Sequence, residues 1–248
     1  MSVEAPNGIK FNSIVTASNR NQRDTDGWFQ ALFHQAAQNQ SSPPESPKKS
    51  TQWMAYYGAS ETNQADAQHK MSMLDQDGLL KFTHVQPHQE RGLNQVLQSL
   101  ATKPKVKHLI IRDSLLAHHH LQTVSEVLKH NDGLAWLVLD HNAIDDRGIR
   151  HLSEGLKGAV GIRHVVLSDN HIGVEGAHEL ANVLTHNKGI ETLWLQGNKI
   201  TDSPAKALVH AATDHPTLKT ISLIGNPISH QQKTDFSAKQ CFNCRIMV

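Results

Sequence analysis

The sequence predicts an α/β solenoid, in which repeated strand and helix units build one parallel sheet. Three observations support this fold class. An apolar pattern recurs every 28 residues, with starts at Val106, Leu134, Ile162, Ile190 and Leu218. Within each copy the apolar positions lie at offsets of 3, 5, 8 and 10 from the start, and the segments between the copies space their apolar residues as a helix does. A fixed period of this length is typical of repeat architectures.

The five rows of the pattern are closely similar. They read VKHLIIRDSLL, LAWLVLDHNAI, IRHVVLSDNHI, IETLWLQGNKI and LKTISLIGNPI, with Ser114 in place of the asparagine of the other rows. The pattern L-x-x-L-x-L-x-x-N-x-L resembles the leucine-rich repeat family, and the repeat length resembles its ribonuclease-inhibitor-like class. The resemblance covers about residues 78–248 and implies a right-handed horseshoe with a parallel concave sheet, convex helices, five clear repeats and caps.

The segments between the rows predict helices. They carry apolar pairs four residues apart: Leu152 and Leu156, Leu180 and Leu184, Leu208 and Ala212. Gly148, Gly176 and Pro204 share one column, and we expect this column to begin each helix because proline is tolerated there.

A column of asparagines follows the strands, at Asn142, Asn170, Asn198 and Asn226. We expect each amide to bond backbone groups that the turn leaves unpaired, which is a structural role.

Both ends of the array predict caps. Val96 and Leu100 keep the helix register one period before the first full repeat, but GLLKFTHVQPH does not keep the strand columns, which indicates a degenerate capping repeat. At the other end, Phe236 falls in the buried helix column, and Ile246 lies 28 residues after Leu218. We therefore expect a polar-faced last helix followed by a short strand.

Residues 1–77 have a different composition, rich in Gln, Asn and Ser, and include SSPPESPKKS. We expect this extension to be partly disordered or to pack as the N-terminal cap of residues 78–248, through the apolar clusters DGWFQALFHQAA and QWMAYY. A short partner-binding or membrane-surface helix is the alternative, and the lack of flanking Lys and Arg argues against the membrane.

The strand register predicts which side chains leave the core. Successive strand residues point to opposite faces, so if Leu137 and Leu139 point inward, Trp136 points outward into solvent. An exposed patch of aromatic and aliphatic side chains ringed by polar ones marks an interaction site, with Trp136 and Trp194 as anchors. The predicted partner-binding residues are Trp136, Trp194, His108, His164, Arg112, Asp140, His141, Asp169, Val138 and Val166. The alternative is that residues 1–77 fold back and cover this groove.

Motifs for other chemistry are weak. In the HHH at residues 118–120, adjacent side chains diverge and do not easily converge on one metal ion. His108 and His164 lie two repeats apart, about 10 Å for strands spaced by 4.8 Å, which is too far for them to bind one ion together. Cys241 and Cys244 lack the thioredoxin-like context of a redox pair and are expected to be cap residues. The net charge of +1 argues against nucleic acid or an anionic membrane. We expect no metal, no cofactor, no catalytic residue and no membrane insertion.

The leading hypothesis is therefore a module that binds a globular protein partner through its concave face. The resemblance implies inhibition of a partner enzyme by occlusion of its active site, as in an effector that an intracellular bacterium injects into the host cytosol, acting on a host protein or on another effector. We expect a cytoplasmic chain without a signal peptide that is monomeric when free. The alternative is an enzyme with its activity in residues 1–77 and the repeats as substrate reader, which that short polar segment disfavours.

Overall fold

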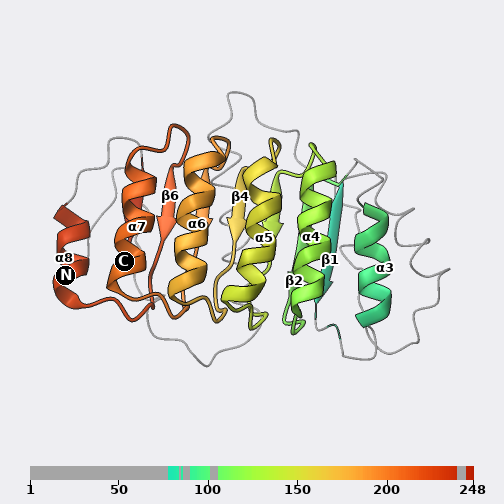
Figure 1. Ribbon diagram of the computed structural model, residues 1–248, viewed down its shortest axis with the longest axis horizontal. Coiled ribbons are helices and arrows are strands. Elements are labelled where there is room, and N and C mark those ends of the chain that lie inside the picture. The colour runs from blue at the N-terminus through green and yellow to red at the C-terminus, as the bar shows by residue number, and fades with distance from the viewer. Residues whose placement is uncertain (1–77, 84, 86–89, 101–105, 239–243) are drawn as a thin grey trace, which may run out of the picture. The chain divides into compact units, whose positions relative to one another are not determined.

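The computed structural model describes residues 78–83, 85, 90–100, 106–238 and 244–248, and Figure 1 shows their elements. Strands and helices alternate along the described residues in this order: β1 (Leu79–Thr83), α3 (Glu90–Leu100), β2 (His108–Arg112), α4 (His118–His130), β3 (Trp136–Val138), α5 (Asp146–Gly158), β4 (His164–Val166), α6 (Val174–His186), β5 (Thr192–Trp194), α7 (Asp202–Thr213), β6 (Thr220–Ser222), α8 (His230–Ala238) and β7 (Arg245–Met247). The predicted extension 1–77 lies outside the described residues, and its boundary stays a prediction.

All strands of the described residues pair in one parallel sheet, in the order in which they occur in the chain. The pairing keeps the 28-residue register from β2 to β6, so His108, Trp136, His164, Thr192 and Thr220 lie side by side. The predicted α/β solenoid with a parallel sheet is confirmed.

The core lies between the sheet and the row of helices. Leu137 and Leu139 from the strand side pack in one cluster with Leu152 and Leu156 from α5, and none of the four is more than 1% exposed. Burying one leucine side chain contributes about 2 kcal/mol, so the repeated leucines supply the main stabilisation of each unit. The apolar pairs predicted for the helices are all buried here.

The asparagine column bonds backbone groups, as predicted. Asn170 Oδ1 accepts hydrogen bonds from the backbone N–H groups of Asn142 and Ile144, at 3.1 and 2.9 Å. Its Nδ2 donates to three carbonyl oxygens, including that of Leu139 in the preceding row at 2.9 Å. In the first row Ser114 takes the place of the asparagine. Its hydroxyl donates a hydrogen bond to the Arg112 carbonyl and accepts one from the Val85 N–H. The column therefore joins each turn to its neighbour.

The predicted helix starts are two residues late. Gly148, Gly176 and Pro204 are the third residues of α5, α6 and α7, which begin at Asp146, Val174 and Asp202. A proline is still accommodated there, because the first four N–H groups of a helix have no intrahelical partner.

The two terminal strands depart from the 28-residue period. Leu79 of β1 pairs with His108, 29 residues later, and this single extra residue explains why the strand columns are not visible at a spacing of 28. At the other end Ile246 of β7 pairs with Ile221, so the predicted alignment of Ile246 with Leu218 is wrong and the last unit is shorter. Phe236 is buried in the core as predicted.

Candidate functional site

The outer sheet face is the name used here for the side chains of β2 to β6 that point away from the helices. The hydrophobic core cluster that contains Leu137 and Val165 does not include Trp136, Val138 or Trp194, which confirms the predicted direction of these side chains. The outer sheet face comprises two columns: His108, Trp136, His164, Thr192 and Thr220, and Ile110, Val138, Val166, Trp194 and Ser222.

The prediction that this face is open to solvent is wrong. Trp136 and Trp194 are each 7% exposed, and Val138 and Val166 are 1% exposed. Part of the reason is packing within the column, because the Trp136 ring stacks on His164 with ring centroids 3.8 Å apart and meets the edge of His108 at 6.5 Å. The alternative that residues 1–77 cover the groove falls outside the described residues and stays a prediction.

The two histidines of this column are neutral aromatic rings at pH 7. Burial lowers the pKa of His164 to about 4, against a smaller opposing effect of Glu191. Burial and the nearby Lys107 also lower the pKa of His108. The ring of His164 is held by a 3.0 Å hydrogen bond between its Nδ1 and the Thr192 hydroxyl. The column is therefore an uncharged stack beside a charged group of residues at the carboxyl ends of the strands.

That charged group begins with a buried ion pair. Arg112 Nε lies 2.8 Å from both carboxylate oxygens of Asp140, and Arg112 Nη2 lies 2.7 Å from Asp140 Oδ2. The two side chains are 10% and 5% exposed, so the pair is shielded from water. The two residues occupy the same position in adjacent rows, 28 residues apart, and the repeat itself therefore brings them together.

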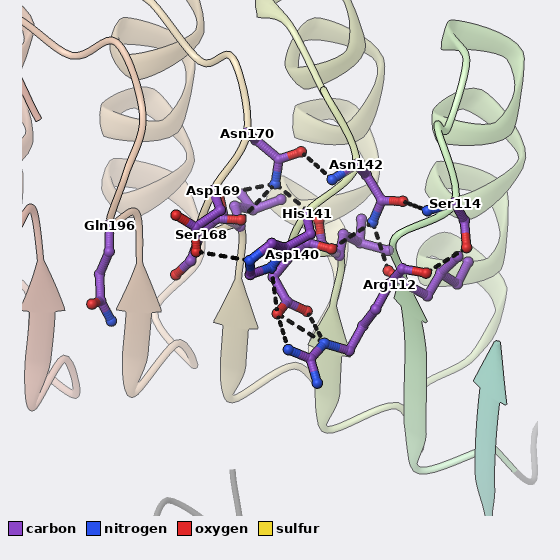
Figure 2. A network of polar contacts seen from close by, with 12 residues as sticks. Arg112, Ser114, Asp140, His141, Asn142, Ser168, Asp169, Asn170 and Gln196 are labelled. Atoms are coloured by element: carbon purple, nitrogen blue, oxygen red, sulfur yellow. Dashed lines mark hydrogen bonds and ion pairs between the residues drawn. The ribbon is translucent and has the colours of Figure 1, made fainter. Parts of the chain in front are cut away.

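His141 extends the pair toward solvent (Figure 2). Its Nδ1 lies 3.2 Å from Asp140 Oδ2 and its Nε2 lies 3.5 Å from Asp169 Oδ2. The hydrogen bond to Asp140 raises the pKa of His141 despite partial burial, and Asp169 and Asp113 add to the rise. For Asp140, burial raises the pKa, but the bonds from His141 and Arg112 outweigh it and the net pKa is lowered. The predicted polar residues Arg112, Asp140, His141 and Asp169 thus form one network.

Two columns of this region have left-handed backbone geometry. Leu115 and Ala143 form the shorter one, with φ values of 44° and 54°, and the longer one runs through five rows. Asp113, His141 and Asp169 have φ values of 49°, 56° and 53°, and Gly197 and Gly225 occupy the same position in the next two rows at 63° and 73°. Sequence reasoning missed Asp113 and the significance of the longer column. The glycines seven residues after the starts Ile190 and Leu218 were the available signal, because glycine favours such turns.

The accessible part of the region is the rim, defined here as the exposed residues that follow the strands at their carboxyl ends. Leu115 is 71% exposed, the side chain of Asp169 is 50% exposed and that of His141 is 41% exposed. The rim comprises Asp113, Leu115, His141, Ala143, Asp169, His171, Gly197, Lys199, Ile224, Gly225 and Pro227. Of the predicted polar residues, His141 and Asp169 therefore reach solvent, whereas Arg112, Asp140 and the aromatic anchors are buried.

The described part of the chain holds no group of three His, Cys, Asp or Glu placed to bind a metal ion. In the HHH motif, His118 lies 3.5 Å from Asp145, whereas His120 is buried. Cys244 is buried, and Cys241 lies outside the described residues. None of the helices in the described ranges has the length and apolarity needed to cross a bilayer.

One family model matches a segment of the repeat array, and two solved structures are similar to part of the chain. A family model described as a leucine-rich repeat matches residues 162–181. One similar solved structure, titled as the actin-binding site 2 of leiomodin-1, has 16% identity and a TM-score of 0.48, over 58% of this chain and 85% of that one. The tropomodulin C-terminal domain of Caenorhabditis elegans has 14% identity and a TM-score of 0.46, over 59% and 88%. No curated protein matches the sequence. The repeated rows, the asparagine column and the parallel sheet form an α/β solenoid, and the leucine-rich-repeat match covers its third row and the first part of α6.

Proposed function

We propose that this protein is a protein-binding module and that the rim is its contact surface. The observation that carries the proposal is the longer left-handed column. A non-glycine residue in this geometry costs about 1–2 kcal/mol, and Gly197 and Gly225 occupy the same backbone position in the next rows. Asp113, His141 and Asp169 place charged groups at the exposed rim. Their left-handed geometry costs free energy that glycine at the same position would avoid.

The network beneath the rim supports this role. Binding sites are precise when the contacting side chains are held by other residues, and here His141 contacts the buried Asp140, which is itself bonded to Arg112. Leu115 and Ile224 add exposed apolar area, at 71% and 36% exposure, to a charged edge. This mixture of apolar area and oriented charge suits a protein partner, because charges set the register of an interface and apolar area contributes affinity.

The proposed contact differs from the one expected from sequence. Trp136 and Trp194 are buried, so their replacement would confuse lost binding with lost stability. The rim is exposed without any rearrangement, which makes it the better target for substitution.

The test compares the introduction of negative charge at the two ends of the strands. The rim variant combines Leu115→Glu with Lys199→Glu, and the control combines Val160→Glu with Lys188→Glu at the opposite ends of the strands, where Val160 is 66% exposed. Proteins captured by the full chain are identified, purified and measured for Kd against each variant, after circular dichroism shows that both are folded. We expect the rim variant to weaken binding at least tenfold, about 1.4 kcal/mol, and the control to leave Kd unchanged. Equal loss in both variants, or none in the rim variant, would refute the rim as the contact surface.

The finer expectations stay predictions. They are that the partner is an enzyme whose active site is occluded, that the chain acts as a bacterial effector in a host cytosol, and that it has no enzymatic activity of its own. An activity assay of the captured partner with and without this protein tests inhibition directly. A catalytic activity assigned to residues 1–77 would favour the alternative of an enzyme with a repeat-based substrate reader.

A further inference from the structure

The outer sheet face is buried although it lies outside the core between sheet and helices. Val138 and Val166 are 1% exposed and Trp194 is 7% exposed, yet none of the three belongs to the core cluster. The described helices lie in a row in front of the strands in Figure 1, and these side chains point to the other side of the sheet. Neighbours within a sheet cover only the flanks of a side chain, because it stands roughly perpendicular to the sheet. Burial to this degree requires a further layer over the face.

The length of the remaining segments decides which part of the chain is able to supply that layer. Outside the described residues lie 1–77 and the short gaps 84, 86–89, 101–105 and 239–243. Each gap holds at most five residues, which span about 18 Å when fully extended, and has to join the described residues on either side of it. The strands from β2 to β6 already extend over about 19 Å across the sheet. Within this chain, residues 1–77 are therefore the segment long enough to cover the outer sheet face.

We propose that the outer sheet face is the docking surface of residues 54–77 of the same chain. This segment leads directly into β1, the first strand of the sheet, so its docking closes a shorter loop than docking of any earlier segment. A shorter loop costs less conformational entropy. The segment contains two apolar runs, MAYY at 54–57 and MSML at 71–74, whose methionine and aromatic side chains suit the tryptophans and valines of the face.

Two buried hydroxyls favour this segment over the apolar cluster at residues 26–37. Ser222 belongs to the outer sheet face, and Ser168, two residues after Val166, has the same direction by alternation. Both are buried, and neither hydroxyl has a hydrogen-bond partner among the residues that the structure describes. A layer that buries them has to bring polar groups, because buried polar groups are normally hydrogen-bonded. Residues 54–57 contain both tyrosines of the chain, each an aromatic ring with a hydroxyl, whereas DGWFQALFHQAA has no hydroxyl side chain.

This docking goes beyond the proposed function and does not rest on it. With residues 54–77 in place, the aromatic side chains of the sheet contact an internal segment, and the rim, where Leu115 is 71% exposed, stays open to an external partner. A protein that binds the sheet itself has to displace this segment first.

Photo-crosslinking in the full chain identifies the occupant directly. Thr192, a partly buried residue of the outer sheet face, is replaced by p-benzoyl-phenylalanine, and the control carries the same replacement at Val160, which is 66% exposed. A mixture of ¹⁵N-labelled and unlabelled chains distinguishes crosslinks within a copy from those between copies. We expect most crosslinks from position 192 to fall within residues 54–77 of the same copy, and few of those from position 160 to do so. Crosslinks from position 192 to residues 1–53, or to a second copy, would overturn the proposal.

Two matched double variants test which apolar run holds the layer in place. Hydroxyl-radical footprinting measures how fast Trp136 and Trp194 are oxidised, with the buried Leu152 as the reference for an intact core. Tyr56→Glu/Tyr57→Glu should raise the oxidation rate of both tryptophans at least fivefold, because a buried carboxylate opposes docking. Trp28→Glu/Phe29→Glu should leave that rate unchanged.

The outcomes of the footprinting are decisive in both directions. Rapid oxidation of the tryptophans in the unaltered chain, or slow oxidation in the tyrosine variant, would refute the docking of residues 54–77. Faster oxidation in the Trp28/Phe29 variant alone would assign the layer to residues 1–53 and refute it equally. If the tyrosine variant also exposes Leu152, its core has opened, and the crosslinks from position 192 decide, since they are made without that variant.

Discussion

Two halves of the same rim share a backbone and differ in chemistry. In the rows of β2, β3 and β4, the left-handed position is occupied by Asp113, His141 and Asp169, whereas in the rows of β5 and β6 it is occupied by Gly197 and Gly225. The column above differs in the same way, since Arg112 and Asp140 form a buried ion pair and their counterparts Gln196 and Ile224 are uncharged. The repeat therefore sets the backbone, and the side chains determine which half presents charge.

The boundary between the halves shows how they depend on each other. A Cβ at Gly197 would collide with the Asp169 carboxylate, so the glycine leaves the room that the last acidic residue of the charged half occupies. At Gly225 the nearest atom to such a Cβ is Gly197 N at 3.4 Å, which is ordinary contact. Gly197 therefore allows both its own left-handed turn and the position of the Asp169 side chain, whereas Gly225 is required only for its own turn.

The largest effect is expected from breaking the buried ion pair. Arg112→Ile leaves Asp140 buried without its main cation, and we expect a loss of about 3–5 kcal/mol in the free energy of unfolding. The double variant Arg112→Ile/Asp140→Gln makes these rows resemble the uncharged half and should recover at least half of that loss, because no unpaired charge remains. Urea denaturation of both single variants and the double variant measures the coupling. Additive losses would show that the pair is not coupled and that the comparison of the halves is misleading.

The second effect concerns the glycines of the uncharged half. Gly225→Ala should cost about 1 kcal/mol, because alanine tolerates the left-handed geometry poorly but meets its neighbours only at ordinary contact distance. Gly197→Ala should cost about 2–3 kcal/mol, since it adds displacement of the Asp169 carboxylate to the same backbone strain. The pair is compared by urea denaturation, with Gly197→Ala/Asp169→Ala as a rescue. If Gly197→Ala costs no more than Gly225→Ala, the two halves do not interact at their boundary.

Much of this arrangement followed from periodicity. The 28-residue repeat predicted the strand register, the buried leucines and the bonds of Asn142 and Asn170, because those features depend on residues at fixed offsets. The same register brought Arg112 to Asp140, so four of the predicted polar residues meet in one network.

Other features depend on information that a period does not contain. The register of β1 was hidden by one extra residue, and a single shift moves every side chain to the other face of the sheet. The strand register correctly gave the direction of Trp136, away from the core between sheet and helices. The direction of a side chain does not determine its exposure, and Trp136 is only 7% exposed. Left-handed turns at Asp113 and Asp169 were missed because acidic residues adopt that geometry without a distinctive sequence mark.

The smallest effect is a pH dependence that distinguishes the two halves. His164 stacks on Trp136 with its pKa lowered to about 4, whereas the equivalent positions in the other half are Thr192 and Thr220, which do not titrate in this range. The unfolded chain binds a proton near pH 6.5 and the folded chain does not until about pH 4, so the stability that His164 contributes as a neutral ring is present above pH 6.5 and is lost progressively as the pH falls toward 4. At pH 5 the loss should be about 1–2 kcal/mol relative to pH 7.

His164→Thr tests this by giving the row the residue of the uncharged half. The variant should be less stable at pH 7, because the stacking is lost, but its stability should fall less between pH 7 and pH 5 than that of the unaltered chain. His108, whose pKa is also lowered, leaves a residual dependence of the same sign. His141 acts in the opposite direction, because its raised pKa adds stability below pH 6.5 that is lost as the pH rises through its folded pKa, and its exposure limits that contribution to about 0.5 kcal/mol. Urea midpoints measured across this range decide the matter, since an unchanged slope in His164→Thr would mean that acid sensitivity does not arise from the aromatic column of the charged half.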